Sequence, residues 1–357
     1  MKVIQIMPKF DLAGAEIMCE NLVYSLRNLG VDIIVVSLYS QRTPITDRME
    51  AAGIDVRYLD KKLGLDLSII RKLKKIFKQE KPDALHSHLY VKQYAIPAAI
   101  LARVKRRVHT VHNVAEKELG SKKRKLAKIF YRHNGVTPVA LSDIVRESIV
   151  REYNIVADKI PVVYNGIDLS RCFPKEDYES KGHHFSILHI GRFETQKNHP
   201  MLLEAFSKFH RACPNSVLRL IGDGAGREAA EDLARKLDII DCVEFSGKQS
   251  DVYRYLHEAD IFVLPSLYEG VPMTLIEAMG TGLPIVATAV GGVPDMLKDG
   301  ENALLTAVDS QEVADAMLKL ANDVDLREKL GQNALVRSVA FSAEEMAKKY
   351  LQIYQNT

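Results

Sequence analysis

Hydrophobic and polar positions along the first half of the chain follow two different periods. Short runs of β-branched and other apolar residues, typical of buried strands, are separated by segments in which apolar residues recur at helical spacing. The expected strands are 2–7, 32–38, 83–88, 106–112 and 161–166, and the clearest helices are 15–29 and 71–79. This order predicts parallel strands joined by crossover helices, which is an α/β fold.

The same pattern restarts near Phe185. Strands are expected at 185–191, 216–222, 243–247, 261–266 and 284–288, and helices at 200–213, 227–237 and around Tyr253. The sequence therefore predicts two Rossmann-like, doubly wound parallel sheets, in residues 1–169 and 185–340, with a polar linker at 170–184. Open parallel sheets bind ligands beyond the carboxyl ends of their strands, so we expect the two domains to face a central cleft that holds the active site.

Length and composition are compatible with this arrangement. A chain of 357 residues is longer than one hydrophobic core usually serves. Apolar runs such as 33–36 and 261–264 are far shorter than the roughly 20 residues that span a bilayer, and Met1 leads directly into a strand. The four cysteines form no CxxC pair, which predicts neither a disulfide framework nor a zinc site. We expect a cytoplasmic protein without a signal peptide.

Charge is distributed unevenly between the two halves. Residues up to Asp168 carry a net charge of +11 and the remainder −8. The basic residues gather at 71–78, 103–107 and 121–133, with apolar residues at helical spacing in the last segment. These clusters are compatible with solvated helix faces, or with adhesion to an anionic membrane surface or a charged acceptor. Nucleic acid is not expected as a partner because no recognition motif accompanies the charge.

Two motifs at strand ends of the second half suggest a phosphate ligand. In "GRFETQKN", Arg192 and Lys197 follow an expected strand, and two such cations suit a diphosphate leaving group, although they could equally be surface cations before a helix. In "IGDGAGRE", Gly222, Gly224 and Gly226 lack the GxGxxG spacing of a dinucleotide fingerprint. They indicate a tight turn that brings backbone close to a ligand.

The segment 264–296 places two carboxylates around a helix start. Pro272 suits the first position of a helix that Gly280 ends, and the amides of 270–275 other than that of Pro272 form a seat for phosphate. Glu277, inside the helix, can accept hydrogen bonds from ribose hydroxyls, and Glu269, on the turn, can reach a reacting sugar. Alternatively, Glu269 interacts with the helix dipole and Glu277 is simply exposed.

Five motifs in order resemble glycosyltransferase family 4, the retaining enzymes of the GT-B fold. They are "AGAE" at 13–16, "HTVHN" at 109–113, "NGID" at 165–168, "GRFETQKN" at 191–198 and "PSLYEGVPMTLIEAMGTGLPIVATAVGG" at 265–292. The resemblance spans the chain and departs at Ala13, where the family usually has the first glycine of a pair. Alanine permits the turn if its φ is negative. In this fold the last helix, here within 341–357, usually crosses back to the first domain.

The resemblance implies a role for each matching residue. Arg192 and Lys197 would bind the donor diphosphate, Glu277 the ribose and Glu269 the transferred sugar, with Glu269, His112, Arg192 and Lys197 as the catalytic set. Further donor contacts are expected from Gly14 of the first domain and from Gly224, Gly247, Lys248, Gly270, Val271, Pro272, Thr274 and Leu275. His112, Asn113 and Asn165 would lie on the acceptor side, whereas His109 is assigned to packing.

The implied reaction needs no protein nucleophile and no cofactor. The nucleoside diphosphate leaves and the acceptor attacks from the same face, so the protein supplies positive charge and positioning. No metal is expected: Asp323 and Asp325 of "DVD" suit helix caps, and His86 and His88 of "HSH" alternate on a strand without a third ligand.

Donor and acceptor are less well specified. A UDP-sugar is favoured on frequency alone. The basic clusters suggest a lipid-linked saccharide acceptor at the inner face of the cytoplasmic membrane, used in cell-surface polysaccharide assembly. Two other functions stay open, a nucleotide-sugar-binding subunit that transfers nothing and a nucleotide-sugar epimerase of the same fold. A dehydrogenase is disfavoured because "DLAGAE" lacks the dinucleotide fingerprint.

Overall fold

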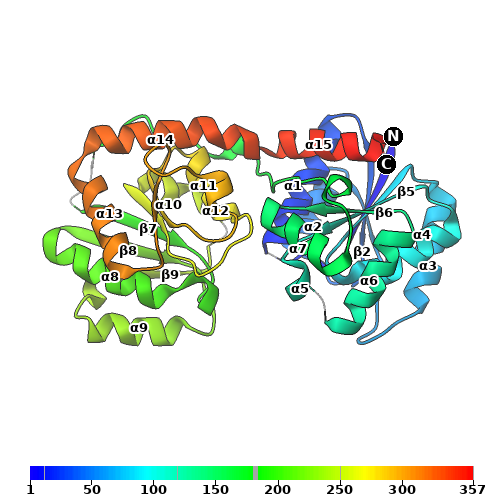
Figure 1. Cartoon of the computed structure of the whole chain (residues 1–357), viewed down its shortest axis with the longest axis horizontal. Helices are drawn as coiled ribbons and strands as arrows, with labels where there is room; N and C mark the ends of the chain where they lie inside the picture. The colour runs from blue at the N-terminus through cyan, green and yellow to red at the C-terminus, as the bar shows by residue number, and fades with distance from the viewer. Residues whose placement is uncertain (12, 119, 180–183, 250, 357) are drawn as a thin grey trace. The chain divides into compact units, whose positions relative to one another are not determined.

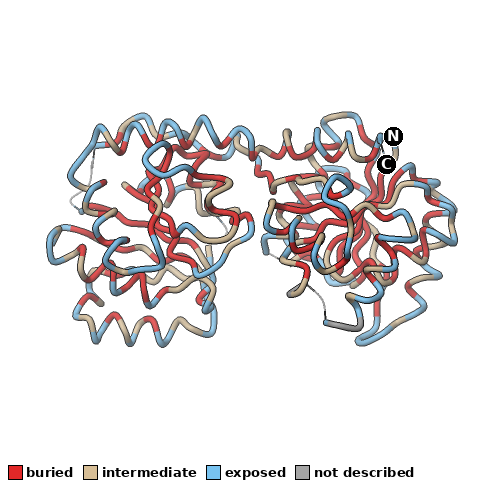
Figure 2. The backbone as a smooth tube through the Cα atoms, viewed as in Figure 1, coloured by how far each residue is buried: buried red, intermediate tan, exposed pale blue. Residues whose placement is uncertain are grey.

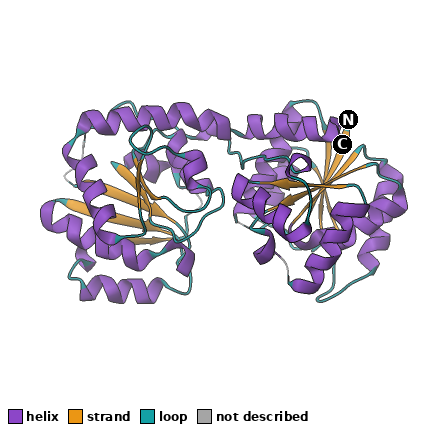
Figure 3. Cartoon of the chain, viewed as in Figure 1, coloured by secondary structure: helices purple, strands orange, loops and turns teal. Residues whose placement is uncertain are grey.

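A computed structural model describes residues 1–11, 13–118, 120–179, 184–249 and 251–356. By its internal contacts the chain divides into two units, Met1–Ile167 with Ser342–Thr357, and Asp168–Phe341. In each unit helices flank a central parallel sheet whose strands are the most buried part of the backbone (Figures 1, 2 and 3). The division falls two residues before the expected end of the first domain at 169.

The first unit contains a six-stranded parallel sheet in the order β3-β2-β1-β4-β5-β6. The strands are β1 (Lys2–Met7), β2 (Asp32–Ser37), β3 (Asp55–Tyr58), β4 (Ala84–His88), β5 (Arg106–Val111) and β6 (Val136–Ala140). The helices are α1 (Gly14–Asn28), α2 (Pro44–Ala51), α3 (Ser68–Glu80), α4 (Lys92–Ala102), α5 (Ala115–Glu118), α6 (Ser121–His133), α7 (Asp143–Tyr153) and α15 (Ala343–Asn356). Short 3₁₀ turns occur at Leu89–Val91 and Ala157–Lys159. This strand order places the topological switch point between β1 and β4.

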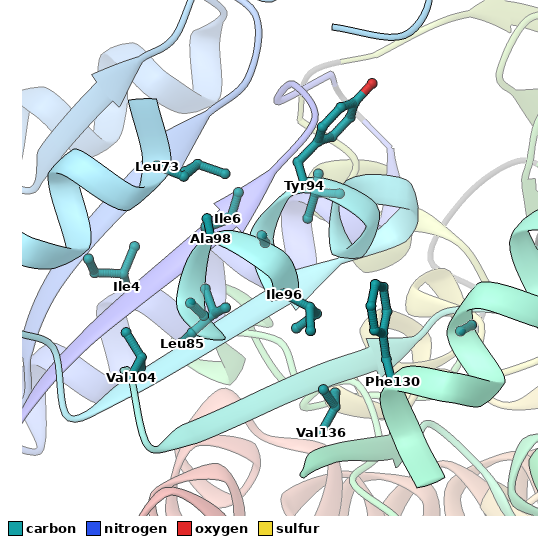
Figure 4. Packing of buried hydrophobic residues seen from close by; sticks show 14 of the residues in the cluster. Ile4, Ile6, Leu73, Leu85, Tyr94, Ile96, Ala98, Val104, Phe130 and Val136 are labelled. Carbon is teal, nitrogen blue, oxygen red and sulfur yellow. The ribbon is translucent and has the colours of Figure 1, made fainter. Parts of the chain in front are cut away.

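Apolar faces of strands and helices build the core of this unit. Ile4 and Ile6 of β1 and Leu85 of β4 are buried in one cluster with Leu73 of α3 and Tyr94 of α4 (Figure 4). In α3 the buried residues recur at positions 69, 73 and 77, one face of a helix, and the rest of that helix is left for charge. The packing therefore fixes which side of α3 faces water.

The sequence patterns missed three strands and predicted one that is absent. β3, whose side chains are only partly buried, lies at the sheet edge, β6 contains Pro138, and β12 (Leu304–Thr306) has only three residues, so each gives a weak signal. The predicted strand at 161–166 is wrong. This segment makes a single isolated bridge, Ala140 to Val162, before it reaches the start of α15.

Helix α15 belongs to the first unit, as the resemblance implies, and packs on α1. Its side chains Tyr350 and Tyr354 are fully buried. A β-carbon on Gly166 would lie 2.5 Å from the carbonyl oxygen of Ser342, so only glycine lets the chain pass this close to the helix start.

The second unit repeats the topology, with strand order β12-β11-β10-β7-β8-β9. Its other strands are β7 (Phe185–Ile190), β8 (Ser216–Ile221), β9 (Val243–Gly247), β10 (Ile261–Leu264) and β11 (Ile285–Thr288). Its helices are α8 (His199–Ala212), α9 (Arg227–Lys236), α10 (Tyr253–Glu258), α11 (Met273–Gly280), α12 (Val293–Met296), α13 (Ser310–Asn322) and α14 (Val324–Ser338). Here the switch point lies between β7 and β10.

The segment 170–184 is not a free linker where the structure describes it. The amide of Lys175 donates to the carbonyl of Thr281 (2.9 Å), and the Tyr178 hydroxyl donates to the carbonyl of Gly282 (2.9 Å). The buried Arg327 guanidinium donates twice to the Tyr178 carbonyl, at 3.0 and 3.1 Å. These residues therefore form part of the second unit; positions 180–183 lie outside the described residues.

In the described ranges, no helix has both the length and the apolar character required to cross a membrane.

Candidate functional site

The second unit brings Lys197 and Glu269 together at its switch point. Lys197 ends the 3₁₀ turn Thr195–Lys197 after β7, and Glu269 lies between β10 and α11. The loops that follow two neighbouring strands on opposite sides of a switch point diverge and leave a ligand site between them. Lys197 Nζ lies 2.6 Å from Glu269 Oε1, and the two side chains are 16% and 4% exposed.

Other donors complete the shell around the Glu269 carboxylate. The Ser266 hydroxyl donates to Oε1 (2.6 Å) and the Gln196 amide donates to Oε2 (3.2 Å). The same amide nitrogen of Gln196 donates to the carbonyl of Tyr268, at 3.0 Å. A nearly buried carboxylate is stabilised as an anion by such donors. The sequence motifs gave no role to Gln196 or Ser266, because the contacts of both residues depend on the geometry of the turns.

Two glycines allow the loops that carry this pair to pack closely against neighbouring loops. Gly291, which follows β11, has φ +56°, and a β-carbon on it would lie 1.9 Å from the carbonyl oxygen of Glu269. Gly222 has φ +144°, and a β-carbon there would lie 1.9 Å from the carbonyl oxygen of Gly191. The glycine loop after β8 therefore packs closely against the loop after β7. This is compatible with the tight turn predicted from the sequence.

A pocket of about 510 Å³ opens beside Gln196. Three loops line it, those after β7, β8 and β10, with residues Phe193, Glu194, Thr195, Gln196, Ala225, Gly226 and Tyr268. The expected donor residue Gly224 packs by its backbone against Phe193 instead of lining this pocket. Gly247 accepts the Gly222 amide through its carbonyl (2.9 Å), and Lys248 is exposed.

The first turn of α11 offers fewer free amides than the sequence predicts. The Leu275 amide is bonded to the Pro272 carbonyl (3.1 Å), so its expected availability is wrong. Pro272 is the N-cap, and within the described residues the Met273 and Thr274 amides have no hydrogen-bond partner. The buried Thr274 Oγ1 also lacks one. Two amides and a hydroxyl at a helix start can accommodate an anion.

Arg192 is not part of the Lys197–Glu269 pair. Its side chain is 70% exposed and forms a surface ion pair with Glu194 (2.7 Å). Exposed pairs of this kind contribute little to stability, so the guanidinium can leave Glu194 at small cost. The structure thus brings Lys197, Glu269 and the α11 turn together and leaves Arg192 on an adjacent surface.

Glu277 lies about one turn along α11, beside Arg171, Cys172 and Tyr253. The side chain is partly buried, and no hydrogen bond or ion pair reaches its carboxylate from the residues that the structure describes. Burial raises the pKa of Glu277 to about 7, against the opposing effect of the positive charge on Arg171. A ligand that donates hydrogen bonds here would favour the charged form.

In the first unit, His112 follows β5 and contacts a buried histidine. His112 Nε2 lies 3.1 Å from His88 Nδ1, and His88 Nε2 lies 2.9 Å from the Gln5 side-chain oxygen. The Gln5 amide donates to the Tyr354 hydroxyl (3.1 Å). That hydroxyl lies 2.7 Å from His86 Nδ1, and His86 Nε2 lies 2.7 Å from the Thr110 hydroxyl. Thr110 lies 2.7 Å from Tyr350.

This chain of hydrogen bonds runs in one direction. Because the Gln5 amide donates to Tyr354, its oxygen must accept from His88 Nε2–H. His88 is then unprotonated at Nδ1 and accepts from His112 Nε2–H. Burial lowers the pKa of His88 and of His86 well below its usual value, helped by repulsion from neighbouring histidines, so both rings stay neutral. His112 therefore donates through Nε2–H to His88.

The remaining expected residues of the first unit are placed as follows. Gly14 is the exposed first residue of α1, and Ala13 before it has φ −136°, which alanine adopts without strain. Asn113 is exposed and its side chain accepts from the Val114 amide (2.8 Å), whereas Asn165 is buried. His109 is buried, 2.9 Å from both Ser87 and Lys92, in a packing position.

The "DVD" and "HSH" segments, for which no metal is expected, have structural partners. Asp323 caps α14 by accepting from the Leu326 amide (2.9 Å), and His86 and His88 belong to the hydrogen-bond chain. Among the described positions there is no group of three or more His, Cys, Asp or Glu that could hold a metal ion.

The close approach of Gly291 to Glu269 can be tested by substitution. Gly291→Ala should lower the free energy of unfolding by about 2–4 kcal/mol, because left-handed strain and a backbone clash act together. Gly300→Ala is the matched control: it has φ +68° but nothing within 4 Å of the added carbon, so only about 1 kcal/mol is expected. Urea denaturation measures both values, and equal losses would contradict the close packing.

The tautomer of His112 can be measured by ¹⁵N nuclear magnetic resonance. Tyr354→Phe removes the acceptor for the Gln5 amide and the hydroxyl that faces His86, so Gln5 can turn over and His112 should become a mixture of tautomers. Tyr153 is a buried residue of α7 that does not belong to this series of hydrogen bonds, so Tyr153→Phe should leave the His112 signals unchanged. An unaltered Nε2–H signal in Tyr354→Phe would show that the chain does not set the tautomer.

Two family models match successive parts of the chain, and curated relatives match most of its length. The family model "Glycosyltransferase Family 4" matches residues 12–171 and the model "Glycosyl transferases group 1" matches residues 173–337. The chain is 30% identical over 309 residues to N-acetyl-alpha-D-glucosaminyl L-malate synthase of Bacillus anthracis, covering 81% of this chain and 78% of that enzyme. It is 28% identical over 314 residues to an Escherichia coli UDP-Gal:alpha-D-GlcNAc-diphosphoundecaprenol alpha-1,3-galactosyltransferase, covering 78% of each.

Solved structures share the fold over the whole chain. HepE of Anabaena, in complex with UDP and glucose, superimposes with a TM-score of 0.84 at 19% identity and full coverage of both chains. Sucrose-phosphate synthase of Thermosynechococcus elongatus gives a TM-score of 0.79 at 20% identity, covering 99% of this chain and 98% of the other. Together with the two repeated sheets and the sequence relatives, these matches show that the chain belongs to glycosyltransferase family 4 and is a glycosyltransferase of the GT-B fold.

Proposed function

We propose that this glycosyltransferase takes its sugar from a UDP-sugar and transfers it, with retention of configuration, to a lipid-linked saccharide in cell-surface glycan synthesis. The observation that carries the proposal is the Lys197–Glu269 pair at the switch point of the second unit, next to the first turn of α11. The UDP bound to HepE and the uridine donor and lipid acceptor in the name of the Escherichia coli relative support the choice of substrates.

The diphosphate would be bound by positive charge that is already in place. Lys197 has three donor hydrogens and Glu269 takes one, so the others can reach phosphate oxygens. The Met273 and Thr274 amides and the Thr274 hydroxyl add further donors, and Arg192 can turn from Glu194 toward the same anion. These groups stabilise the charge that builds on the leaving diphosphate, and we propose that they do so without a metal ion.

Glu269 would act mainly through Lys197. Its carboxylate is 4% exposed and already accepts from three donors, which occupy most of its acceptor sites before a sugar arrives. The Glu269 oxygens can still accept a sugar hydroxyl if Gln196 moves. We therefore propose that Glu269 also contacts the transferred sugar. His112, oriented by its hydrogen bond to His88, would contact a hydroxyl of the donor sugar or of the acceptor.

The stereochemical outcome tests the reaction directly. A uniformly ¹³C-labelled UDP-sugar and a short-chain prenyl-diphosphate saccharide are incubated with the protein, and the anomeric coupling of the product is read by nuclear magnetic resonance. A product with the donor's α configuration is expected. An inverted product would contradict retention, donor isomerised without an acceptor would indicate an epimerase, and binding without turnover would indicate a non-transferring subunit.

Removal of the cation at the switch point should slow transfer. Lys197→Met should lower kcat by about 10²–10³-fold, the usual loss when one group that stabilises a leaving charge is removed. Lys236→Met, at the end of α9, is a control that should keep full activity. Melting curves for both variants separate a catalytic effect from unfolding, because Lys197→Met also leaves the Glu269 anion without its cation. A change in kcat of less than threefold would remove Lys197 from the proposal.

Donor affinity should depend on pH through Glu277. The free carboxyl has a raised pKa of about 7, and two ribose hydroxyls that donate to it would lower that pKa in the complex. Binding then releases a proton, so affinity is highest above about pH 8 and falls by up to about tenfold per pH unit below the free pKa. Calorimetry with an intact UDP-sugar, whose diphosphate does not titrate in this range, measures the profile.

Glu277→Gln is the matched variant for this profile. It should bind the donor more weakly at high pH, because an amide is a poorer acceptor for two hydroxyls, and its affinity should change little with pH. The same pH slope in the variant would show that another group carries the dependence.

A further inference from the structure

The loop between β3 and α3 exposes three leucines at alternate positions. Leu63, Leu65 and Leu67 are 92%, 75% and 62% exposed. Single apolar residues at a surface are normal in folded proteins, but three within five positions form an apolar patch that commonly marks an interaction site. We call residues 61–68 the leucine loop.

The leucine loop is held in this form by polar side chains. The buried Lys61 donates to the carbonyls of Lys62 (2.8 Å) and Gly64 (2.6 Å) and lies over the rings of Tyr39 and Tyr94. Asp66 accepts from the Lys62 amide (3.0 Å). It also accepts from the amide and hydroxyl of Ser68, at 3.0 and 2.6 Å. The leucines are thus presented outward by an ordered backbone, and little ordering entropy is lost on binding.

Basic side chains continue this surface along α3. Arg71, Lys75 and Lys78 are exposed, and in the described ranges none of them pairs with a carboxylate; Lys72 donates to the carbonyl of Leu59. Helix α3 packs on α4, which packs on α6, and the exposed side of α6 carries Lys123 and Lys125 with Leu126 and Ile129 (Figure 1). Apolar side chains flanked by unpaired cations match the interface of an anionic bilayer.

Topology places the leucine loop at the same edge of the sheet as His112. The loop follows β3 and His112 follows β5, and in a parallel sheet the carboxyl ends of all strands lie at one edge. A membrane docked at this edge would present a lipid-linked saccharide on the side of the unit that carries His112.

We propose that the leucine loop inserts its three leucines into the interfacial layer of an anionic membrane while the basic residues of α3 and α6 contact its headgroups. This proposal rests on the proposed function, because it gives the lipid-linked acceptor its membrane surface. It assigns the apolar contact to Leu63, Leu65 and Leu67, which lie outside the basic clusters that the sequence alone indicated.

Vesicle co-sedimentation tests the insertion. Wild type is expected to bind phosphatidylcholine vesicles that contain phosphatidylglycerol, and the triple variant Leu63→Gln, Leu65→Gln, Leu67→Gln should bind them at least about tenfold more weakly. A matched triple, Val156→Gln, Val336→Gln, Val339→Gln, changes residues that are 61%, 75% and 58% exposed and should bind as wild type does. Equal binding by the leucine triple, or no binding by wild type, would overturn the proposal.

Two further measurements separate the possible causes of failure. Arg71→Glu, Lys75→Glu, Lys78→Glu should also reduce binding and lower its salt dependence, whereas the leucine triple should keep that dependence. Donor binding and transfer to a short-chain acceptor without vesicles should be unchanged in the leucine triple. These assays need no membrane, and their failure in wild type would therefore count against the proposed function alone. If wild type is a dimer and the leucine triple is a monomer, the leucine loop contacts a second copy of the chain, and the membrane proposal is overturned.

Discussion

The ion pair between Lys197 and Glu269 is the constraint on which the second unit's site depends. Its carboxylate is almost completely buried, so it must be matched by donors, and Lys197, Ser266 and Gln196 supply them from the ends of two neighbouring strands. The requirement extends to the backbone, because Gly291 has no room for a side chain against Glu269. The result is a cation fixed beside a helix start, which is the arrangement that a departing diphosphate needs.

In the first unit, neutral hydrogen-bonding side chains orient His112. His112 is oriented through His88, Gln5 and Tyr354, so the tautomer of a residue after β5 depends on a tyrosine of the last helix. Burial keeps the inner histidines uncharged, and a chain of neutral donors and acceptors then has a defined direction. The family resemblance assigned α15 to this unit, and the structure adds that its tyrosines complete a hydrogen-bond chain.

Much of the fold could be predicted because strands buried on both faces are nearly continuous apolar runs, as in β2 and β10, and because glycine and proline mark the ends of α11. Edge strand β3, with polar side chains, gave no such signal. The site residues could be named from motifs, but their partners could not. Ser266 and Gln196 meet Glu269, and His88 meets His112, only through tertiary contacts, and the pairing of Leu275 with Pro272 depends on where the helix begins.

Binding of the diphosphate of a uridine nucleotide sugar by the second unit can be measured with a thermal-shift panel of UDP, GDP, ADP and TDP and their sugar conjugates. A ligand at about 100 times its Kd stabilises the folded state by about 2.7 kcal/mol, which raises the melting temperature by several degrees. We expect this shift with uridine ligands and its loss in Lys197→Met. No shift with any nucleotide, or an undiminished shift in the variant, would contradict it.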